Sequence, residues 1–231
     1  MFNGKNKAVT FSYDDGVMQD IRLIEILNKY GLKSTFNLNS ELLDCDGELN
    51  IQNKKICHNK VAKTDVRKIY DGHEIAVHTL THPNLNRLKD DKEIIRQVVE
   101  DQKNLSELAE YEVFGMAYPG GQPNFNSHVA QLIEDNTSIK YARTTIQNYD
   151  FELQRDLIEF HPTVHHTEWE KMFSLAEEFL NKEADTPQIF YIWGHSYEFD
   201  IDNTWDKFEE FCRFISGQND VFYGTNIEVL L

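Results

Sequence analysis

The sequence predicts an α/β protein built as a barrel, and three observations support this fold class. Runs of β-branched and aromatic residues alternate with segments of helical periodicity, which is typical of parallel strands joined by right-handed crossovers. About seven such units fit into the 231 residues, which suits a closed or nearly closed barrel better than an open, doubly wound sheet, the alternative fold. Aspartate, histidine, proline and glycine residues directly follow several predicted strands, as expected where the C-terminal ends of barrel strands form an active site. We expect one domain covering residues 1–231.

Composition narrows the classes of partner and compartment. The chain has 23 Lys and Arg against 39 Asp and Glu, a formal net charge of −16, so nucleic acid and membranes are not expected partners. No apolar stretch of about 18 residues predicts a membrane span, and the first residues lack the pattern of a secretory signal. Cys45, Cys57 and Cys212 show no CxxC spacing and suit a reducing compartment. We therefore expect a cytoplasmic protein, whose oligomeric state the sequence leaves open.

The first half of the chain contains three predicted strands and two helices around one irregular segment. Residues 8–13 form a β-branched and aromatic run that stops at the turn signal Asp14, Asp15 and Gly16. Apolar residues then recur at helical spacing from 21 to 27. The following elements are, in order, a C-cap at Gly31, a strand at 34–38, an irregular excursion at 39–62, a helix at 64–70 and a strand at 74–77.

The second half continues the alternation of helices and strands. Ile94, Val98 and Leu105 share one face of a long predicted helix. A capping box of Thr167 and Glu170 begins a helix that reaches about residue 181. The other elements are that long helix at 90–110, strands at 114–117, 141–144, 187–193 and 221–223, a break at 119–123, a helix at 127–134, and a last helix from an Asn203 cap to Ser216, followed by Gly217.

Polar residues that can carry chemistry stand just past four of the predicted strands. The C-terminal ends of barrel strands converge on one face, where active sites are built. Residues far apart in the sequence are therefore expected to be neighbours in the fold. They are Asp14 and Asp15, His78 and His82, Pro119 and Gly120, and His195.

The spacing of His78 and His82 suggests a metal site. Four residues apart, both imidazoles lie on one side if the segment takes a helical turn, within reach of one ion. Two histidines and a carboxylate form a three-ligand set that leaves one coordination position open. Of Asp14 and Asp15, one carboxylate can ligate while its neighbour accepts a proton. The alternatives are hydrogen-bonded loop histidines and a solvated Asp-Asp-Gly turn.

Other residues at the predicted mouth allow more than one role. His195 is a candidate fourth ligand, a general acid or a loop histidine. The segment 118–121 is either a turn or the source of a backbone N–H for an oxyanion. Trp193 and Tyr197 either line a sugar-sized pocket or belong to the core. The remaining histidines are expected to be rim or structural residues (His161, His165, His166) or surface and loop residues (His58, His73, His128).

Four motifs together resemble the polysaccharide deacetylase family, the NodB-homology domains of carbohydrate esterase family 4. The family motif TFDDG is similar to residues 12–16, which Thr10 and Phe11 precede. The motif H-[ST]-x-x-H is matched by residues 78–82. The RxP motif is matched in part by residues 117–120, and the LxH motif resembles residues 193–195. The motifs follow the family's order and cover nearly the whole chain.

The resemblance implies a distorted (β/α)7 barrel and a metal-dependent hydrolase that removes an acetyl group from an N-acetylated carbohydrate. It implies one divalent metal ion, zinc by default, with manganese, cobalt or iron as alternatives. The implied site is Asp14 as general base, Asp15, His78 and His82 as metal ligands, His195 as general acid, the Gly120 N–H in the oxyanion hole, and Tyr118, Pro119, Trp193 and Tyr197 around the substrate.

Three positions depart from the family pattern. The arginine of the third motif falls at Ala117, and we expect Arg143, at the end of the next strand, to take its place as the residue that orients the base. No DxxDW motif is present, so the carboxylate that tunes His195 is unidentified. Trp193 replaces the leucine expected at the acetyl pocket, which bears on the size of the acyl group.

Other functions remain open from the sequence alone. We expect the substrate to be a soluble oligosaccharide or a small amide, because a secretory signal pattern is not seen. Some members of the same fold family resemble cyclic-amide hydrolases. A non-catalytic carbohydrate- or metal-binding relative would explain the missing arginine and DxxDW motif. A glycosidase using two carboxylates is disfavoured, because Asp14 and Asp15 are sequence neighbours and need not flank one bond.

Overall fold

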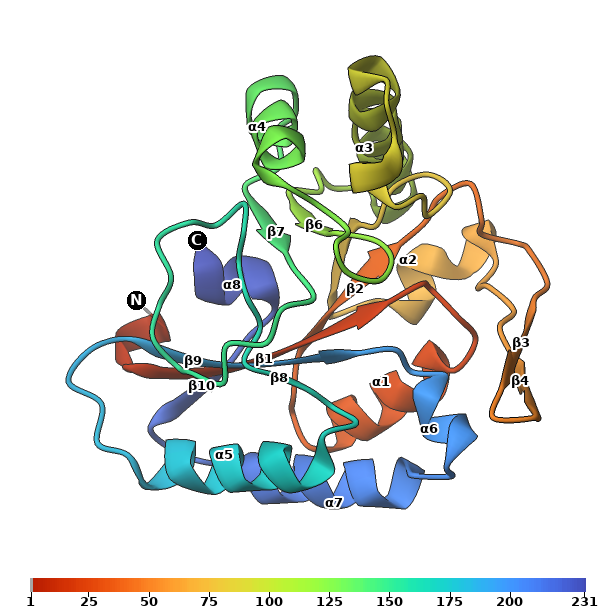
Figure 1. Cartoon of the computed structure of the whole chain (residues 1–231). Coiled ribbons are helices and arrows are strands. Elements are labelled where there is room, and N and C mark those ends of the chain that lie inside the picture. The colour runs from red at the N-terminus through yellow and green to blue at the C-terminus, as the bar shows by residue number, and fades with distance from the viewer. Residues whose placement is uncertain (1) are drawn as a thin grey trace.

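Eight strands form one curled, parallel sheet in the computed structural model, which describes residues 2–231 (Figure 1). A separate antiparallel hairpin is formed by β3 (Glu48–Ile51) and β4 (Lys54–Cys57). In sheet order the strands are β7 (Tyr141–Arg143), β6 (Gly115–Ala117), β5 (Glu74–Val77), β2 (Ser34–Leu38), β1 (Lys7–Asp14), β9 (Gln188–Gly194) and β8 (Val164–His165), with β10 (Val221–Tyr223) paired to the first half of β1.

Most of the helices cover the outside of the curled sheet, whereas α8 (Asn226–Leu230) packs against its inside (Figure 1). The other helices are α1 (Asp20–Lys29), α2 (Val66–Ile69), α3 (Asp91–Ala109), α4 (Ser127–Asn136), α5 (Trp169–Asn181), α6 (Glu198–Ile201) and α7 (Trp205–Ile215). α5 and α7 lie side by side along one part of the sheet, and α3 and α4 stand together over another (Figure 1). None of the helices within residues 2–231 is both long and apolar enough to span a bilayer.

The central strands alternate between the inside of the curl and its helix-covered outside. On β1, Val9, Phe11 and Tyr13 belong to the large apolar core beneath the helices. The residues between them face inward, so Asp14 points into the curl at the C-terminal end of its strand. A smaller apolar cluster fills the inside and consists of Phe2, Ala8, Phe160, Ile189, Tyr191, Trp193 and Val229.

β7 and β8 are the two edge strands of the sheet order, and the irregular segment that joins them in sequence closes the gap between them. The Phe160 N–H donates to the Ala142 carbonyl (3.0 Å), and the Thr144 N–H donates to the Phe160 carbonyl (2.8 Å). Three residues on, the Thr163 N–H donates to the Tyr191 carbonyl of β9 (2.9 Å). The distorted (β/α)7 barrel expected from the sequence is confirmed, and a loop forms one part of its wall.

Most of the predicted elements are confirmed, with shifts of one or two residues at their ends. β2, β5 and β10 have the predicted bounds, and Gly31, at φ 65, directly follows the C-cap of α1. The predicted helix at 64–70 is a short 3-10 turn (Lys63–Asp65) that continues into α2. Helical and strand periodicities therefore located the elements that bury one face.

Three sequence predictions about local structure are wrong. The excursion at 39–62 contains the β3–β4 hairpin, whose strands are only four residues each and largely exposed, so the alternation of β3 is too short to predict a strand. The Thr167–Glu170 capping box does not form, because the Thr167 hydroxyl bonds His165 Nδ1 at 2.7 Å instead. The N-cap of α7 is Thr204, one residue beyond Asn203, and the chain's capping box lies at α8.

Candidate active site

The first motif turns sharply at the end of β1, where Asp14 and Asp15 are both buried. Asp15 has a φ of 84°, which non-glycine residues rarely adopt, and its N–H donates to the Asn37 carbonyl at 3.0 Å. Gly16, at φ 63, packs so tightly that a Cβ would lie 2.9 Å from Leu38 Cδ2. The turn therefore needs glycine after the two carboxylates.

Asp14 is held by a guanidinium from a neighbouring part of the barrel. Arg143 Nη2 lies 2.5 Å from both Asp14 carboxylate oxygens, and Asn37 Nδ2 donates to Oδ1 at 2.8 Å. Burial raises the pKa of Asp14, but Arg143, His78 and His195 outweigh it and hold the pKa below its usual value. Asp14 is therefore an ionised acceptor at neutral pH.

Arg143 stands directly opposite the position where the family's arginine is missing. In the parallel register of β6 and β7, Arg143 pairs with Ala117. The guanidinium also lies 4.4 Å from the centre of the Trp193 ring, in cation–π contact. Its side chain is fully buried, so its position is fixed by these contacts.

His78 and His82 lie beside Asp15. Their Nε2 atoms are 3.9 and 3.5 Å from Asp15 Oδ1, and the two ring centroids are 4.9 Å apart. Burial lowers the pKa of His78 to about 4, and it also lowers the pKa of His82. Both imidazoles are therefore neutral near pH 7, the form that ligates metals.

The residues present fit a divalent metal ion. One ligand atom from each of Asp15, His78 and His82 lies within 4.8 Å of the others. His78 Nδ1 bonds the Ala117 carbonyl at 2.9 Å, so Nδ1 carries the proton and Nε2 is a free lone pair. That Nε2 is buried and has no hydrogen-bond partner among the described residues. A neutral imidazole oriented in this way is typical of a metal ligand.

His195 lies between Asp14 and a carboxylate that the sequence motifs did not reveal. His195 Nε2 is 3.9 Å from Asp14 Oδ2, and His195 Nδ1 is 3.3 Å from Glu198 Oε2. Burial lowers the pKa of His195, but Glu198, Asp15 and Asp14 outweigh it and raise the pKa to about 9. Glu198, on α6, is therefore the carboxylate that raises the pKa of His195. Its spacing of three residues from His195 was the signal in the sequence that could have revealed it.

Two histidines expected at the rim hold Glu198. His166 is fully buried, its Nδ1 accepts from the Tyr13 hydroxyl (3.2 Å), and its Nε2 bonds Glu198 Oε2 (2.8 Å). His165 ends β8, and its Nε2 lies 3.4 Å from the same oxygen. Despite burial, which raises it, the pKa of Glu198 is held far below its usual value by His195 and His166.

Two further histidines, expected on the surface or in loops, lie in loops but are shielded from solvent. His58 lies 3.3 Å from Asp15 Oδ2. His73 is buried and accepts from the Ser34 N–H at 3.1 Å. His128 is exposed, as expected, and His161 is half-buried and bonds the Thr144 hydroxyl. Only His58 among these four approaches the candidate site.

A cavity of about 420 Å³ opens beside these groups. Of the predicted pocket residues, Tyr118, Trp193 and Tyr197 line it, whereas Pro119 is buried in the turn and does not. The full lining is Asp14, Asp15, His82, Tyr118, Gly120, Gly121, Gln122, Thr145, Trp193, His195 and Tyr197.

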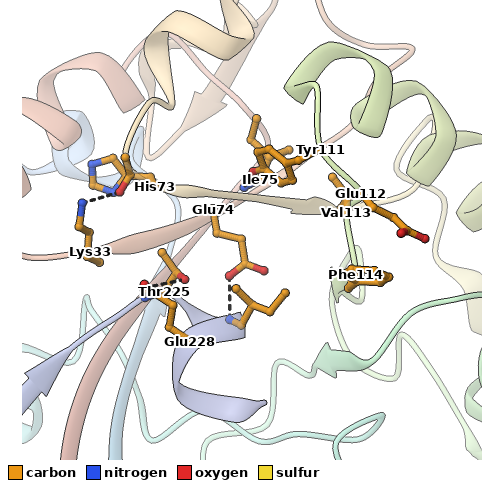
Figure 2. Close-up of a pocket in the computed structure, with 12 residues that line it drawn as sticks. Lys33, His73, Glu74, Ile75, Tyr111, Glu112, Val113, Phe114, Thr225 and Glu228 are labelled. Atoms are coloured by element: carbon orange, nitrogen blue, oxygen red, sulfur yellow. Dashed lines mark hydrogen bonds between the residues drawn. The ribbon is translucent and has the colours of Figure 1, made fainter. Parts of the chain in front are cut away.

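A second cavity, of about 340 Å³, lies where β5 begins, at the opposite end of that strand from His78 (Figure 2). Glu74 reaches toward α8 in this view and accepts from the Ile227 N–H at 2.9 Å. The Thr35 and Tyr141 hydroxyls also donate to Glu74, each at 2.7 Å. Because the buried carboxylate already has three donors, it anchors α8 and leaves no unpaired group for a ligand.

Comparison with known proteins points to one family. The sequence profile described as polysaccharide deacetylase matches residues 3–138, more than half of the chain. A search of curated proteins finds no match.

Solved structures share the fold at low sequence identity. The Bc1960 peptidoglycan N-acetylglucosamine deacetylase is 19% identical, with a TM-score of 0.58 over 97% of this chain and 89% of its own. The Streptococcus pyogenes deacetylase PplD, solved with acetate, is 18% identical, with a TM-score of 0.53 over 65% of this chain. The match spans 61% of that protein, less than two thirds of its length.

A family 4 carbohydrate esterase pseudoenzyme from Bacillus anthracis is equally similar. It is 18% identical, with a TM-score of 0.56 over 98% of this chain and 66% of its own. The shared fold therefore does not by itself separate active from inactive members. The profile match nevertheless places this chain in the polysaccharide deacetylase family, the carbohydrate esterase family 4 hydrolases that act on non-peptide carbon–nitrogen bonds.

Proposed function

We propose that this protein is a metal-dependent deacetylase that hydrolyses the acetamido group of an N-acetylated carbohydrate. One observation carries the proposal: a carboxylate kept ionised by Arg143 faces an imidazole kept protonated by Glu198. The two groups, Asp14 and His195, are 3.9 Å apart at the wall of the same cavity. Opposite pKa shifts on neighbouring groups are the arrangement that assigns a base and an acid.

Asp15, His78 and His82 would hold one divalent ion, and zinc is the default among zinc, manganese, cobalt and iron. When bound, such an ion polarises an amide carbonyl and lowers the pKa of water.

Asp14 would accept the proton of the attacking water. An acceptor must be ionised and must stay in place, and Arg143 provides both, since it pairs with both carboxylate oxygens at 2.5 Å. Asn37 fixes the same carboxylate from the adjacent strand at 2.8 Å.

His195 would donate a proton to the departing amine, which is a poor leaving group unless protonated. Glu198 Oε2 accepts the backbone N–H of His195 at 2.9 Å and lies 3.3 Å from its Nδ1. The same carboxylate therefore orients the ring and keeps it charged, with Nε2 turned toward Asp14.

The Gly120 N–H would donate to the developing oxyanion. Gly120 lines the cavity at φ 83, and its N–H makes no hydrogen bond within residues 2–231. A preorganised, unpaired N–H at this place costs nothing to reorient when negative charge develops.

Aromatic side chains support a sugar as the substrate. Trp193 and Tyr197 line a cavity of about 420 Å³, at the small end of the range for ligand pockets. Trp193 is bulkier than the leucine of the family motif, so we expect acyl groups larger than acetyl to be excluded. The cavity volume also favours a second candidate, a small-amide or cyclic-amide hydrolase of the same fold.

The first experiment is a calorimetric zinc titration of chelator-stripped protein. We expect one tight site in the wild type and in the matched control His128→Ala, an exposed histidine on α4, and its loss in His82→Ala. No binding to the wild type would overturn the metal-dependent mechanism.

The second experiment measures acetate release from N-acetylglucosamine oligomers and from a panel of small cyclic amides, with and without zinc. Zinc-dependent acetate release supports the deacetylase, and hydrolysis of cyclic amides alone supports the second candidate. Zinc binding without any hydrolysis would indicate a non-catalytic relative. Cleavage of glycosidic bonds that survives chelation would indicate a glycosidase.

A further inference from the structure

A short extended segment, residues 58–61, approaches the first motif from outside the barrel, and we call it the 58–61 arm. It pairs antiparallel with the residues that follow Asp15: Val17 bridges Lys60, the Met18 N–H donates to the Asn59 carbonyl (2.9 Å), and the Val61 N–H donates to the Gly16 carbonyl (2.9 Å). This pairing sets the register of the arm against the Asp-Asp-Gly turn.

The register directs alternate side chains of the arm to Asp15. Successive residues of an extended segment point to opposite sides, so His58 and Lys60 share one side and Asn59 faces the other. His58 Nε2 lies 3.3 Å from Asp15 Oδ2, and Lys60 Nζ donates to the Asp15 main-chain carbonyl at 2.8 Å. The Asn59 side chain instead accepts the Gly47 N–H at 3.0 Å, within the hairpin region.

These contacts hold the backbone of Asp15 in the left-handed region, at a φ of 84°. A non-glycine residue in the left-handed region is strained and persists only where its surroundings impose it. With its carbonyl bound by Lys60 and Oδ2 by His58, Asp15 presents Oδ1 to the pair His78 and His82.

The arm is anchored, so its side chains are not free to swing away. Gln19 Nε2 donates to the Cys57 carbonyl (2.8 Å) and to Asp200 Oδ2 (2.9 Å), which ties the start of the arm to α6. The His58 ring also packs edge-on against Tyr197, with 5.0 Å between ring centroids. The His58 side chain is only 18% exposed.

We propose that His58 is a positioning residue for metal binding, acting through Asp15 and not as a ligand itself. The inference rests on the proposed function, because it assumes that Asp15 ligates the ion. A hydrogen-bond donor on one carboxylate oxygen orients the other oxygen toward the metal, and loss of such partners typically weakens metal affinity about 10- to 100-fold. None of the four motifs that define the family includes the 58–61 arm.

The test is the zinc dissociation constant of chelator-stripped variants, measured by calorimetry. We expect His58→Ala to bind zinc about 10- to 100-fold more weakly than wild type. His58→Gln, whose amide can still donate to Asp15, should keep the affinity within about threefold, below the range for losing such a partner. The matched control is Asn59→Ala, which removes the neighbouring side chain of the same arm on its other side.

The outcomes separate the rival explanations. Wild-type affinity in His58→Ala overturns the inference and leaves the proposed function intact, whereas absence of zinc binding in the wild type overturns both. Equal losses in His58→Ala and Asn59→Ala would show a merely structural effect of the arm. Equal losses in His58→Ala and His58→Gln, with a changed visible spectrum of the cobalt-loaded protein, would show that His58 is a ligand.

Discussion

Arg143 and Asp14, which are 129 residues apart, form a buried ion pair in which Nη2 lies 2.5 Å from both carboxylate oxygens. The pair joins the inward faces of β7 and β1, two strands that are not neighbours in the sheet. In register, Arg143 lies beside Ala117, where the family motif carries arginine. The guanidinium that contacts Asp14 therefore comes from β7, the strand next to the β6 position of the family's arginine.

Arg143→Ala should lower kcat about 100-fold, because Asp14 loses the group that orients it. It should leave the zinc dissociation constant unchanged, since Arg143 does not contact the predicted ligands. It should also destabilise the protein by about 3–5 kcal/mol, because a buried carboxylate is left unpaired. Kinetics, calorimetry and urea unfolding measure the three effects.

The matched test is the double variant Ala117→Arg with Arg143→Ala, which moves the guanidinium back to the family position. Partial recovery of kcat is expected, because both positions face the same carboxylate from adjacent strands. Full activity in Arg143→Ala alone would contradict the role assigned to Arg143.

Glu198→Gln should shift the pH dependence of catalysis. Glu198 is the main cause that raises the pKa of His195 to about 9, and the acid is active only while protonated. The rate therefore falls as pH rises through that pKa, and loss of the Glu198 charge lowers the pKa. We expect the high-pH limb of kcat/KM to move down by at least about one pH unit. An unmoved limb, compared with His128→Ala, would exclude the coupling.

Glu74 should make stability depend on pH. Burial raises its pKa from 4.5 in the unfolded chain to about 7 in the folded protein. Between those pH values the folded state binds the Glu74 proton more tightly than the unfolded chain does. The resulting contribution of Glu74 to the free energy of unfolding is fully present below pH 4.5 and is lost as pH rises through 7. The loss amounts to about 3 kcal/mol, at 1.36 kcal/mol per pKa unit.

Glu74→Gln removes that titration while it keeps an amide that can bond Tyr141 and the Ile227 N–H. The free energy of unfolding, from urea curves at several pH values, should fall less steeply with pH in the variant than in wild type. Asp20 and Asp101, whose pKa values burial raises to about 7, titrate in both proteins, so the difference isolates Glu74. Identical pH slopes would rule the effect out.

Gly194→Ala should destabilise the end of β9. A Cβ at this position would lie 2.6 Å from the imidazole of His166, which is fully buried and cannot retreat. We expect a loss of about 1–3 kcal/mol, typical of overpacking. The control is Gly121→Ala, where a Cβ meets nothing within 4 Å and stability should hardly change. Equal unfolding midpoints for the two variants would show that His166 can move.

Much of the site could be predicted because its residues directly follow strands that periodicity locates. Asp14, His78 and His195 each end or follow a buried strand, so a parallel barrel brings them together. Glu198 was missed because it belongs to a four-residue helix without a motif, and His58 because it follows a largely exposed hairpin.

The sequence by itself determined the alternation of strands and helices, the barrel fold and the Asp and His motifs. Those features depend on local periodicity and short spacing, which the linear order of residues already contains. The departure from the family pattern already suggested Arg143 as the residue that orients the base, but the contact itself, with Asp14 129 residues away, is set by the tertiary structure. The contact of His58 with Asp15, 43 residues away, was not predicted at all and was decided only by the tertiary structure. Such contacts follow from strand order and register, which many distant residues set together and which no local pattern encodes.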